Sequence, residues 1–333
     1  MKHSSGLSGI FLTLILISFS FGCGNEVDLH GTGEPIPIVY CLLNPLNQVQ
    51  YIRVGKSFLL SHDQLETDIP ADSLVWPNEA QVYLKRWEDN DPAETIIFEH
   101  STAFGKDSGY FPVEGLMVYQ AEFQPNPGEE YHLFVYFPEL DKIVSGITLV
   151  MSIPEVLDPE NVPGRTVSFD TISPYNVRWR GGTYAGLYQG IFKMNYTESL
   201  NGDFEHHSCF FTTPVYQKQW ANDLYEEKIN GLNFLQSVAK QLTPVPGIQR
   251  KLINFEFLFY AGGSDLAVMV GSELSGSNPF TIIRNTSNIS GGNGVFSSLT
   301  CQRFPNLEPS VITKHFLATS IYTKDLGFKP EGL

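Results

Sequence analysis

Apolar and polar residues alternate in short stretches along the first half of this chain. In residues 131–137, Tyr131, Leu133, Val135 and Phe137 occupy every second position, so a strand here places all four side chains on one face. Further runs of this kind are separated by turn-forming residues: 36–43, 50–58, 81–87, 94–100, 117–123 and 141–151. Short strands at this spacing predict an immunoglobulin- or transthyretin-like β-sandwich over residues 35–154.

The second half of the chain repeats this pattern after a break. Residues 155–164 contain Pro, Gly and acidic residues, and we expect them to form a linker. Alternation resumes at residue 166. In residues 250–260, Ile253, Phe255, Phe257 and Phe259 share one face of what we expect to be a central strand, because the opposite face is partly apolar too. A second β-rich domain is therefore predicted over residues 165–333.

One stretch of the second half departs from alternation. Between residues 223 and 242, apolar residues recur every three or four positions: Ile229, Leu232, Leu235, Ala239 and Leu242. This spacing predicts a single amphipathic helix that packs its apolar stripe on a sheet. The fold class predicted is mainly β, with two β-sandwich-like domains, of which the second carries one helix near 223–242.

The N-terminus carries a short apolar run. Lys2 precedes apolar residues 10–17, and a basic start followed by an apolar run of roughly 7–15 residues is typical of a secretory signal peptide. The run is shorter than the roughly 20 residues of a membrane-spanning helix. We therefore expect a signal peptide over residues 1–22.

The signal peptide ends on a cysteine, Cys23, preceded by Gly22. This ending resembles the lipobox of bacterial lipoproteins, in which the cysteine is acylated, although Ser20 stands where most lipoboxes have Leu. We expect Cys23 to carry palmitate-type acyl chains and residues 23–34 to form a polar tether, because several acyl chains anchor a protein stably. The alternative is ordinary secretion, with Cys23 as a simple thiol.

Charge narrows the range of partners. Residues 1–22 contain one basic residue, Lys2, and no acidic one, so the remaining chain carries 20 Lys and Arg against 36 Asp and Glu, a formal charge of −16. Such a surface repels phosphate backbones, which argues against nucleic acid as a partner. It also leaves the acyl anchor as the expected contact with the membrane.

The remaining cysteines and one polar cluster are the candidates for cross-links and metals. Cys209 and Cys301 both lie in the second half and are the pair we favour for a disulfide, with unpaired buried thiols as the alternative. Asp203, Glu205 and His207 share a face if their segment is a strand, and such a set can hold a transition metal. Their spacing differs from that of the usual structural metal sites, so we expect no metal and no cofactor.

The sequence lacks the GxSxG, HExxH and GxxxxGK[ST] motifs of familiar hydrolases and nucleotide-binding proteins, which argues against an enzyme. Exposed tryptophans can stack on sugar rings, and the candidates for such a platform are Trp76, Trp87, Trp179 and Trp220. Sandwich cores also use tryptophan, so a core position is the alternative for each. If residues 81–87 form a strand, Trp87 shares a face with Tyr83 and Lys85, opposite Val82 and Leu84.

The last third of the chain carries a recognisable pattern. Asn278-Pro279-Phe280 precedes Asn288-Ile289-Ser290-Gly291-Gly292-Asn293-Gly294-Val295-Phe296, and the first half contains Pro127-Gly128-Glu129-Glu130-Tyr131-His132-Leu133. These segments resemble motifs of a family of Bacteroidota outer-membrane lipoproteins catalogued as domain of unknown function 4249. The resemblance spans most of the chain after residue 23, but its motifs are short and rich in glycine.

The resemblance implies a context, because such lipoproteins are typically encoded beside TonB-dependent transporters. We therefore expect a non-enzymatic, lipid-anchored protein on the periplasmic or surface-exposed face of the bacterial outer membrane. It would act as a binding or docking subunit of a TonB-dependent transporter. The alternatives are a stand-alone glycan- or peptide-binding surface lipoprotein and, less favoured, an envelope hydrolase.

Overall fold

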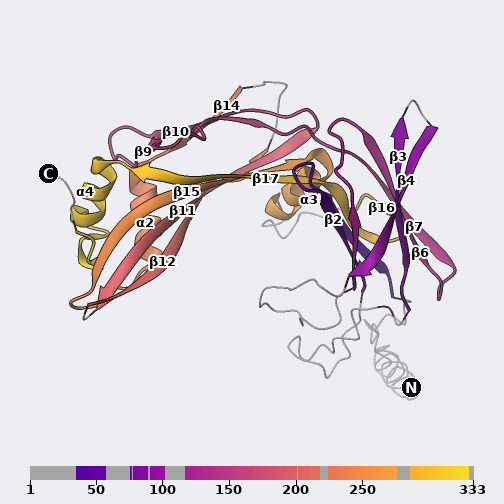
Figure 1. Cartoon of the computed structure of the whole chain (residues 1–333), viewed down its shortest axis with the longest axis horizontal. Coiled ribbons are helices and arrows are strands. Elements are labelled where there is room, and N and C mark those ends of the chain that lie inside the picture. Colours follow the sequence, from indigo (N-terminus) through magenta and orange to yellow (C-terminus); the bar gives the residue numbers. More distant parts are fainter. Residues whose placement is uncertain are drawn as a thin grey trace, which may run out of the picture.

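The protein is elongated and mainly β, with two halves joined lengthwise by one long strand, β17 (Asn293–Pro309; Figure 1). The computed structural model describes residues 35–57, 76, 78–88, 91–101, 117–200, 202–217, 224–275 and 286–329. Each half has its own cluster of buried apolar side chains. The predicted fold class, mainly β with sandwich-like sheets, is confirmed.

The N-terminal half is a sandwich whose two layers share β4. Its strands are β1 (Pro37–Leu43), β2 (Val49–Lys56), β3 (Gln81–Glu88), β4 (Asp91–Ser101), β5 (Met117–Glu122), β6 (Glu130–Phe137) and β7 (Lys142–Leu149). One layer has the order β1-β2-β5-β4 and the other β4-β3-β6-β7. The alternation predicted for residues 131–137 is confirmed in β6, where Tyr131, Leu133, Val135 and Phe137 are all buried.

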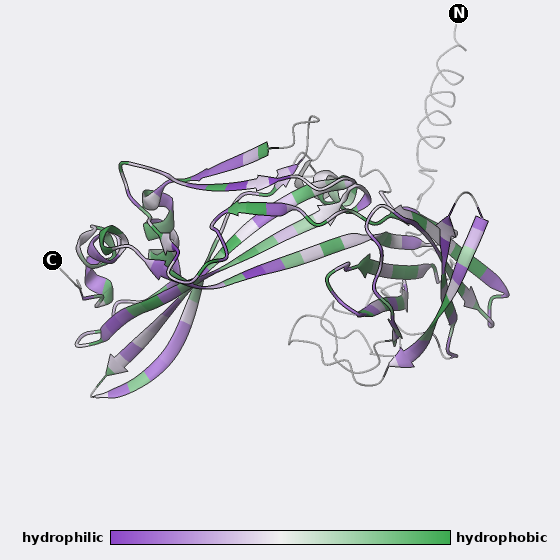
Figure 2. Cartoon of the chain, turned by 45° about the horizontal axis from the view of Figure 1, so that its top comes forward, coloured by the Kyte–Doolittle hydropathy of each residue, from purple (hydrophilic) through white to green (hydrophobic). Residues whose placement is uncertain are grey.

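The C-terminal half combines a long curved sheet with a smaller one. Its strands are β8 (Glu155–Asp158), β9 (Thr166–Val167), β10 (Tyr175–Arg180), β11 (Ala185–Leu200), β12 (Asp203–Thr212), β13 (Tyr216–Gln217), β14 (Leu224–Ile229) and β15 (Gln249–Gly263). The curved sheet runs β12-β11-β15-β17, and β14-β10-β8 form the second sheet. Hydrophobic and hydrophilic segments alternate along these strands (Figure 2), as expected when one face of each strand meets a core.

The central strand β15 agrees with its prediction except at one residue. In β15, which lies between β11 and β17 in the sheet, Phe255, Phe257 and Phe259 are buried. Ile253 is exposed, and Leu252 is buried instead. The register with β11 shifts between Asn195 and Tyr196, which pair with Asn254 and Leu252. Ile253 therefore has no opposite residue on β11. Because an extra residue in a strand inverts the alternation, the residues of β15 before Ile253 point to the opposite face from the one that the sequence predicted.

The helix predicted over 223–242 is shorter and starts later than its prediction. Residues Leu224–Ile229 form β14, and α2 covers Gly231–Gln241 after Asn230, whose side chain accepts a hydrogen bond from the Leu232 amide. Burial of Tyr225 and Ile229 with exposure of Leu224 and Lys228 follows the period of a strand, which overrides the helical spacing.

The prediction of a single helix is also incomplete, since the described residues contain α3 (Ser264–Ser275), α4 (Val311–Thr319) and the 3-10 turn η3 (Lys324–Leu326). None of these helices is long and apolar enough to span a membrane, as judged over the described part of the chain. α3 lies at the junction of the two halves (Figure 1), where the Asp265 carboxylate accepts a hydrogen bond of 2.9 Å from Thr148 of β7.

The predicted linker over 155–164 is partly structured. Its first residues form β8, and Asp158 is buried, with its carboxylate 2.6 Å from both the Arg165 guanidinium and the Tyr175 hydroxyl. These contacts fasten the segment to β10 and to the residues before β9. A polar, proline-containing stretch therefore does not separate two independent domains here.

The domain boundaries differ from a simple division of the chain, because the C-terminal part contributes to the N-terminal sandwich. Residues 293–298 of β17 pair in parallel with β1, and β16 (Ile289–Ser290) pairs with β7. Phe296 and Ile289 are buried in the N-terminal core. From Leu299 onward β17 pairs with β15, so a single strand belongs to both halves.

The connection into β17 is fixed by one asparagine and one glycine of the glycine-rich motif. The Asn288 side chain accepts a hydrogen bond of 2.8 Å from the Phe296 amide and donates one of 2.6 Å to the Phe296 carbonyl. Gly294 has φ +126° and lies directly against the backbone of Val39 in β1. Only glycine fits this close approach of two backbones without strain.

Candidate functional site

Of the four tryptophans predicted as a ligand platform, two are core residues, which corrects the prediction. Trp76 is buried against Phe137, and its indole N–H donates to the Gly55 carbonyl at 2.9 Å. Trp179 is buried and stacks on Tyr225 with 5.6 Å between ring centroids. Each half uses one of these large side chains to fill its core.

The other two tryptophans differ. Trp87 is half-buried on the outer face of β3 and stacks on His132, with 4.6 Å between ring centroids. Trp220 lies outside the described residues. Cys23, the predicted lipidation site, lies outside them as well.

The predicted disulfide between Cys209 and Cys301 is absent, and both thiols are free. Cys209 lies on β12 and Cys301 on β17, with β11 and β15 between them. Three strand spacings of about 4.8 Å separate the two, whereas a disulfide requires Cα atoms within about 7 Å. Burial raises the pKa of Cys209 to about 12, so its thiol stays protonated at neutral pH.

The polar residues considered for a metal lie on the exposed end of β12. His207 stacks on Tyr196, with 5.7 Å between ring centroids, and its Nε2 lies 3.3 Å from a Glu205 carboxylate oxygen. Asp203 and Glu205 are exposed. Within the described ranges no three His, Cys, Asp or Glu side chains converge as a metal site would require.

The outer face of the layer β4-β3-β6-β7 is the strongest candidate for a binding surface. Strand pairing aligns Ile97, Tyr83, Phe134 and Ser145 in one row across the four strands. The neighbouring rows align Lys85 and His132 with Ile147, and Gln81 and Tyr136 with Ile143. We call the apolar and aromatic members of these rows the aromatic face: Tyr83, Trp87, Ile97, His132, Phe134, Tyr136, Ile143 and Ile147.

Three isoleucines make this face unusually apolar for a surface. Ile97, Ile143 and Ile147 are 72%, 55% and 53% exposed. The layer that carries them lies on the far side of the sandwich from the C-terminal half (Figure 1), so that half does not cover it. An exposed patch that combines isoleucine with aromatic side chains is typical of a surface that meets another protein.

The aromatic rings of this face are held in place by one another. Tyr83 and Phe134 stack with 5.2 Å between centroids, and the Lys85 ammonium lies 5.6 Å from the Phe134 ring centroid. These contacts fix the orientation of the rings, so the face presents an ordered aromatic surface to a partner.

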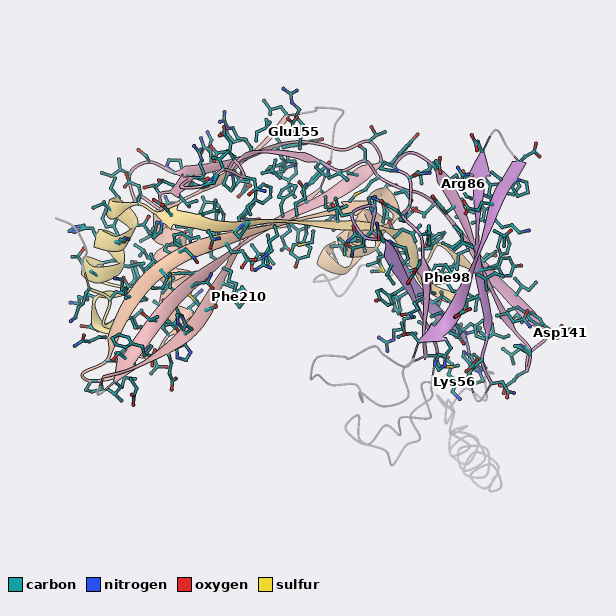
Figure 3. The ribbon with its side chains drawn as sticks, in the orientation of Figure 1. Lys56, Arg86, Phe98, Asp141, Glu155 and Phe210 are labelled. Carbon is teal, nitrogen blue, oxygen red and sulfur yellow. The ribbon has the colours of Figure 1, made fainter. Side chains whose placement is uncertain are left out.

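A groove of about 660 Å³ borders the aromatic face where β4 passes from one layer to the other. Tyr83, Ile97 and Phe98 line it. Figure 3 labels Phe98 on β4 and Arg86 on the paired strand β3. At its polar rim the His100 ring lies 3.1 Å from the Glu79 carboxylate. The groove gives the otherwise flat face a recess for a protruding side chain.

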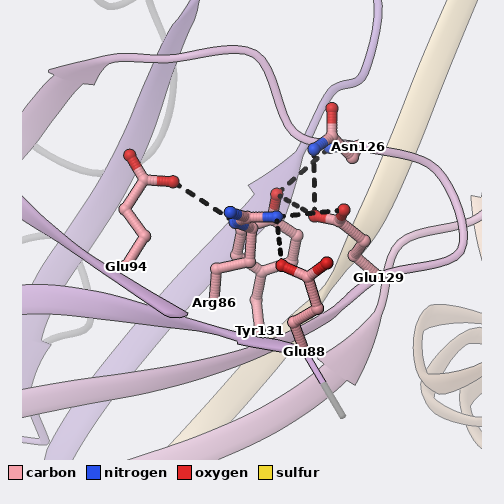
Figure 4. A network of polar contacts seen from close by, with 6 residues as sticks. All are labelled: Arg86, Glu88, Glu94, Asn126, Glu129 and Tyr131. Carbon is pink, nitrogen blue, oxygen red and sulfur yellow. Dashed lines mark hydrogen bonds and ion pairs between the residues drawn. The ribbon is translucent and has the colours of Figure 1, made fainter. Parts of the chain in front are cut away.

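Behind the face, Arg86 ties β3 to the turn before β6 (Figure 4). Its guanidinium lies 3.1 Å from Glu129 and 3.3 Å from Glu94. The hydrogen bond to Glu129 is the main reason that the pKa of Arg86 lies above its ordinary value. Glu129 also accepts a hydrogen bond of 3.0 Å from Asn126, so the network holds the turn against the sheet.

Sequence reasoning found part of this face and missed the rest. It placed Tyr83, Lys85 and Trp87 together, opposite the core. It did not single out Ile97, Ile143 or Ile147, although each occupies the outward position of an alternating strand. Isoleucine at an outward position is the signal that identifies them.

Comparisons with known proteins add no family. No protein-family model matches the chain, and no curated protein matches it. Solved structures of DIP-gamma IG1+IG2 share 10% identity and a TM-score of 0.19, over 69% of this chain and 90% of that one. The FN1-FN3 domains of chicken CNTN1 share 9% identity and a TM-score of 0.18, over 83% and 68%. TM-scores this low carry no argument about function.

Proposed function

We propose that this protein is a non-enzymatic, lipid-anchored accessory protein of the bacterial outer membrane that docks onto a TonB-dependent transporter through the aromatic face. The observation that carries the proposal is the group of three exposed isoleucines beside stacked aromatic rings on one face, because proteins rarely leave such an apolar patch exposed to water unless it binds a partner. The motifs at 288–296 and the signal-like N-terminus support the cellular context.

The chain around the face supports the same proposal. The N-terminal half begins at residue 35, directly after the expected tether, so an anchor on Cys23 keeps this half nearest the membrane. The chain after residue 22 carries a formal charge of −16, so we expect membrane attachment to depend on the acyl chains rather than on surface lysines. A stand-alone glycan- or peptide-binding role is the second candidate, supported by the groove beside Tyr83.

Photo-crosslinking in intact cells tests the docking proposal. With the photoreactive residue benzoylphenylalanine in place of Ile147, we expect a covalent adduct with a large β-barrel protein. The matched control places the same residue at Ile172, which is 87% exposed in the C-terminal half and gives no such adduct. An equal adduct at both positions, or none at Ile147 while the protein remains anchored, contradicts docking through this face.

A second prediction concerns the anchor. The Cys23→Ala variant is expected to leave the outer-membrane fraction almost completely, because it lacks the thiol that accepts the acyl chains. Fractionation after labelling with a palmitate analogue measures both attachment and modification. Unchanged membrane attachment of the variant would contradict lipidation at this residue.

A further inference from the structure

Strand β12 forms the outer edge of the curved sheet, at the rim of the C-terminal half in Figure 1. It pairs with β11 along its whole length without a register shift, and within the described ranges no strand pairs with its other side. Natural edge strands usually carry Lys, Pro or a bulge, which prevent pairing with another chain. Residues 203–210 contain neither Lys nor Pro. The edge of β12 is therefore suited to accept a further strand.

Two contacts establish which backbone groups of β12 point away from the sheet. The side chain of Gln241 in α2 accepts a hydrogen bond of 2.9 Å from the Phe210 amide and donates one of 2.6 Å to the Phe210 carbonyl. The Thr213 amide instead donates to the Gly190 carbonyl of β11 at 2.9 Å. Because the direction of these groups alternates along a strand, the even-numbered residues of β12 direct them outward.

The open part of this edge comprises Phe204, His206 and Ser208. All three residues are exposed, and among the described residues no strand or side chain bonds their outward amide and carbonyl groups. Gln241 occupies the next outward residue, Phe210, so the open stretch ends there. An occupant must therefore be an extended backbone that matches three alternate residues.

A second copy of β12 matches this edge in one antiparallel register. With His206 opposite its own counterpart, Phe204 lies opposite Ser208 of the second copy, so all outward residues exchange hydrogen bonds. The same register places Glu205 opposite His207 of the second copy. Within one chain the Glu205 carboxylate already lies 3.3 Å from His207 Nε2. Each carboxylate thus gains a second imidazole as neighbour, which makes the edge complementary to itself.

Two exposed phenylalanines favour the same register. Phe204 is 73% and Phe210 is 48% exposed, and both lie on one face of the sheet because they are an even number of residues apart. In the register centred on His206, Phe204 of one copy is the diagonal neighbour of Phe210 of the other. Diagonal neighbours on adjacent strands are within reach of aromatic side chains. Pairing would therefore cover apolar surface that the single chain exposes.

We propose that the protein forms a symmetric dimer in which β12 pairs antiparallel with β12 of a second copy, centred on His206. The curved sheets of the two copies then become one continuous sheet. Such a contact is isologous, since the same edge serves both copies. This assembly goes beyond the proposed docking role and is independent of the aromatic face, which lies in the other half.

Cysteine cross-linking of the full chain in mild detergent tests the register. The two copies of residue 206 form a hydrogen-bonded pair with Cα atoms about 5.5 Å apart, within the range for a disulfide. His206→Cys should therefore give a disulfide-linked dimer under mild oxidation. Phe204→Cys is the matched control, because its two copies lie more than about 13 Å apart, and it should give at least about tenfold less.

A proline substitution tests the hydrogen bonding. His206→Pro removes the outward amide hydrogen and leaves the pairing with β11 intact, since proline is tolerated on edge strands. We expect dimerisation at least about tenfold weaker, measured by sedimentation velocity over a concentration series that starts from the monomer. His206→Ala keeps the amide and should dimerise as the unaltered chain does. Thermal unfolding verifies that both variants are folded.

Three results overturn the proposal. The unaltered chain could remain a monomer at every concentration. The two cysteine variants could cross-link equally, which would indicate random collision rather than this register. Dimerisation could be the same for His206→Pro and His206→Ala, which would place the interface elsewhere.

Discussion

Replacing Gly294 by alanine is expected to destabilise the protein by about 4 kcal/mol or more, which exceeds most single substitutions. The added Cβ would overlap the Val39 carbonyl group, and the φ of +126° is one that residues with side chains rarely adopt. Relief requires β17 to move away from β1, which breaks the parallel pairing that completes the N-terminal core. Chemical denaturation followed by tryptophan fluorescence measures the loss, since Trp76 reports this core.

Gly202 provides the matched control for this substitution. It has φ +103°, but an added Cβ would meet no atom within 4 Å. The Gly202→Ala variant should therefore lose only the conformational term, about 1 kcal/mol. Equal losses for the two variants would show that the close approach of β17 to β1 contributes nothing, contrary to our account.

The Phe169→Ala variant is the second large effect we expect, a loss of about 3–5 kcal/mol. Phe169 is fully buried and stacks on Phe234 of α2 with 4.2 Å between centroids. It also makes edge contacts with Phe192 and Phe255 at 5.2 and 5.3 Å. Removing its ring opens a cavity between the helix and the curved sheet, where neighbouring aromatic rings cannot close the gap.

Thermal unfolding of Phe169→Ala should shift the melting temperature down by about 10 °C. Phe204→Ala is the control, because Phe204 is 73% exposed on β12 and its loss is expected to change stability by less than about 0.5 kcal/mol. A similar shift for both variants would contradict a core centred on Phe169.

Alternation predicted the strands well because burial on one face leaves a direct trace in the sequence. β6 is the clearest case, with all four predicted side chains buried. The same signal cannot show which strand pairs with which. Nothing in the residues of β17 reveals that its first part pairs with β1 and its second part with β15, and the expected domain boundary failed for that reason.

The bounds of the helix and the role of two of the four tryptophans were predicted wrongly, for different physical reasons. Residues 224–229 satisfy strand and helix spacing at once, and pairing with β10 decided the outcome. Trp76 and Trp179 are large apolar side chains that can fill a core or face a ligand, and composition alone does not separate these roles.

The most direct test of docking is a mild-detergent pull-down of the tagged native protein from outer membranes, read by mass spectrometry. We predict near-stoichiometric recovery of a large β-barrel transporter with the unaltered chain. The variant carrying Ile97→Asp and Ile147→Asp should recover at least about tenfold less, since buried charge opposes association. Recovery of the anchored lipoprotein alone, or of equal barrel with both forms, would contradict docking through the aromatic face.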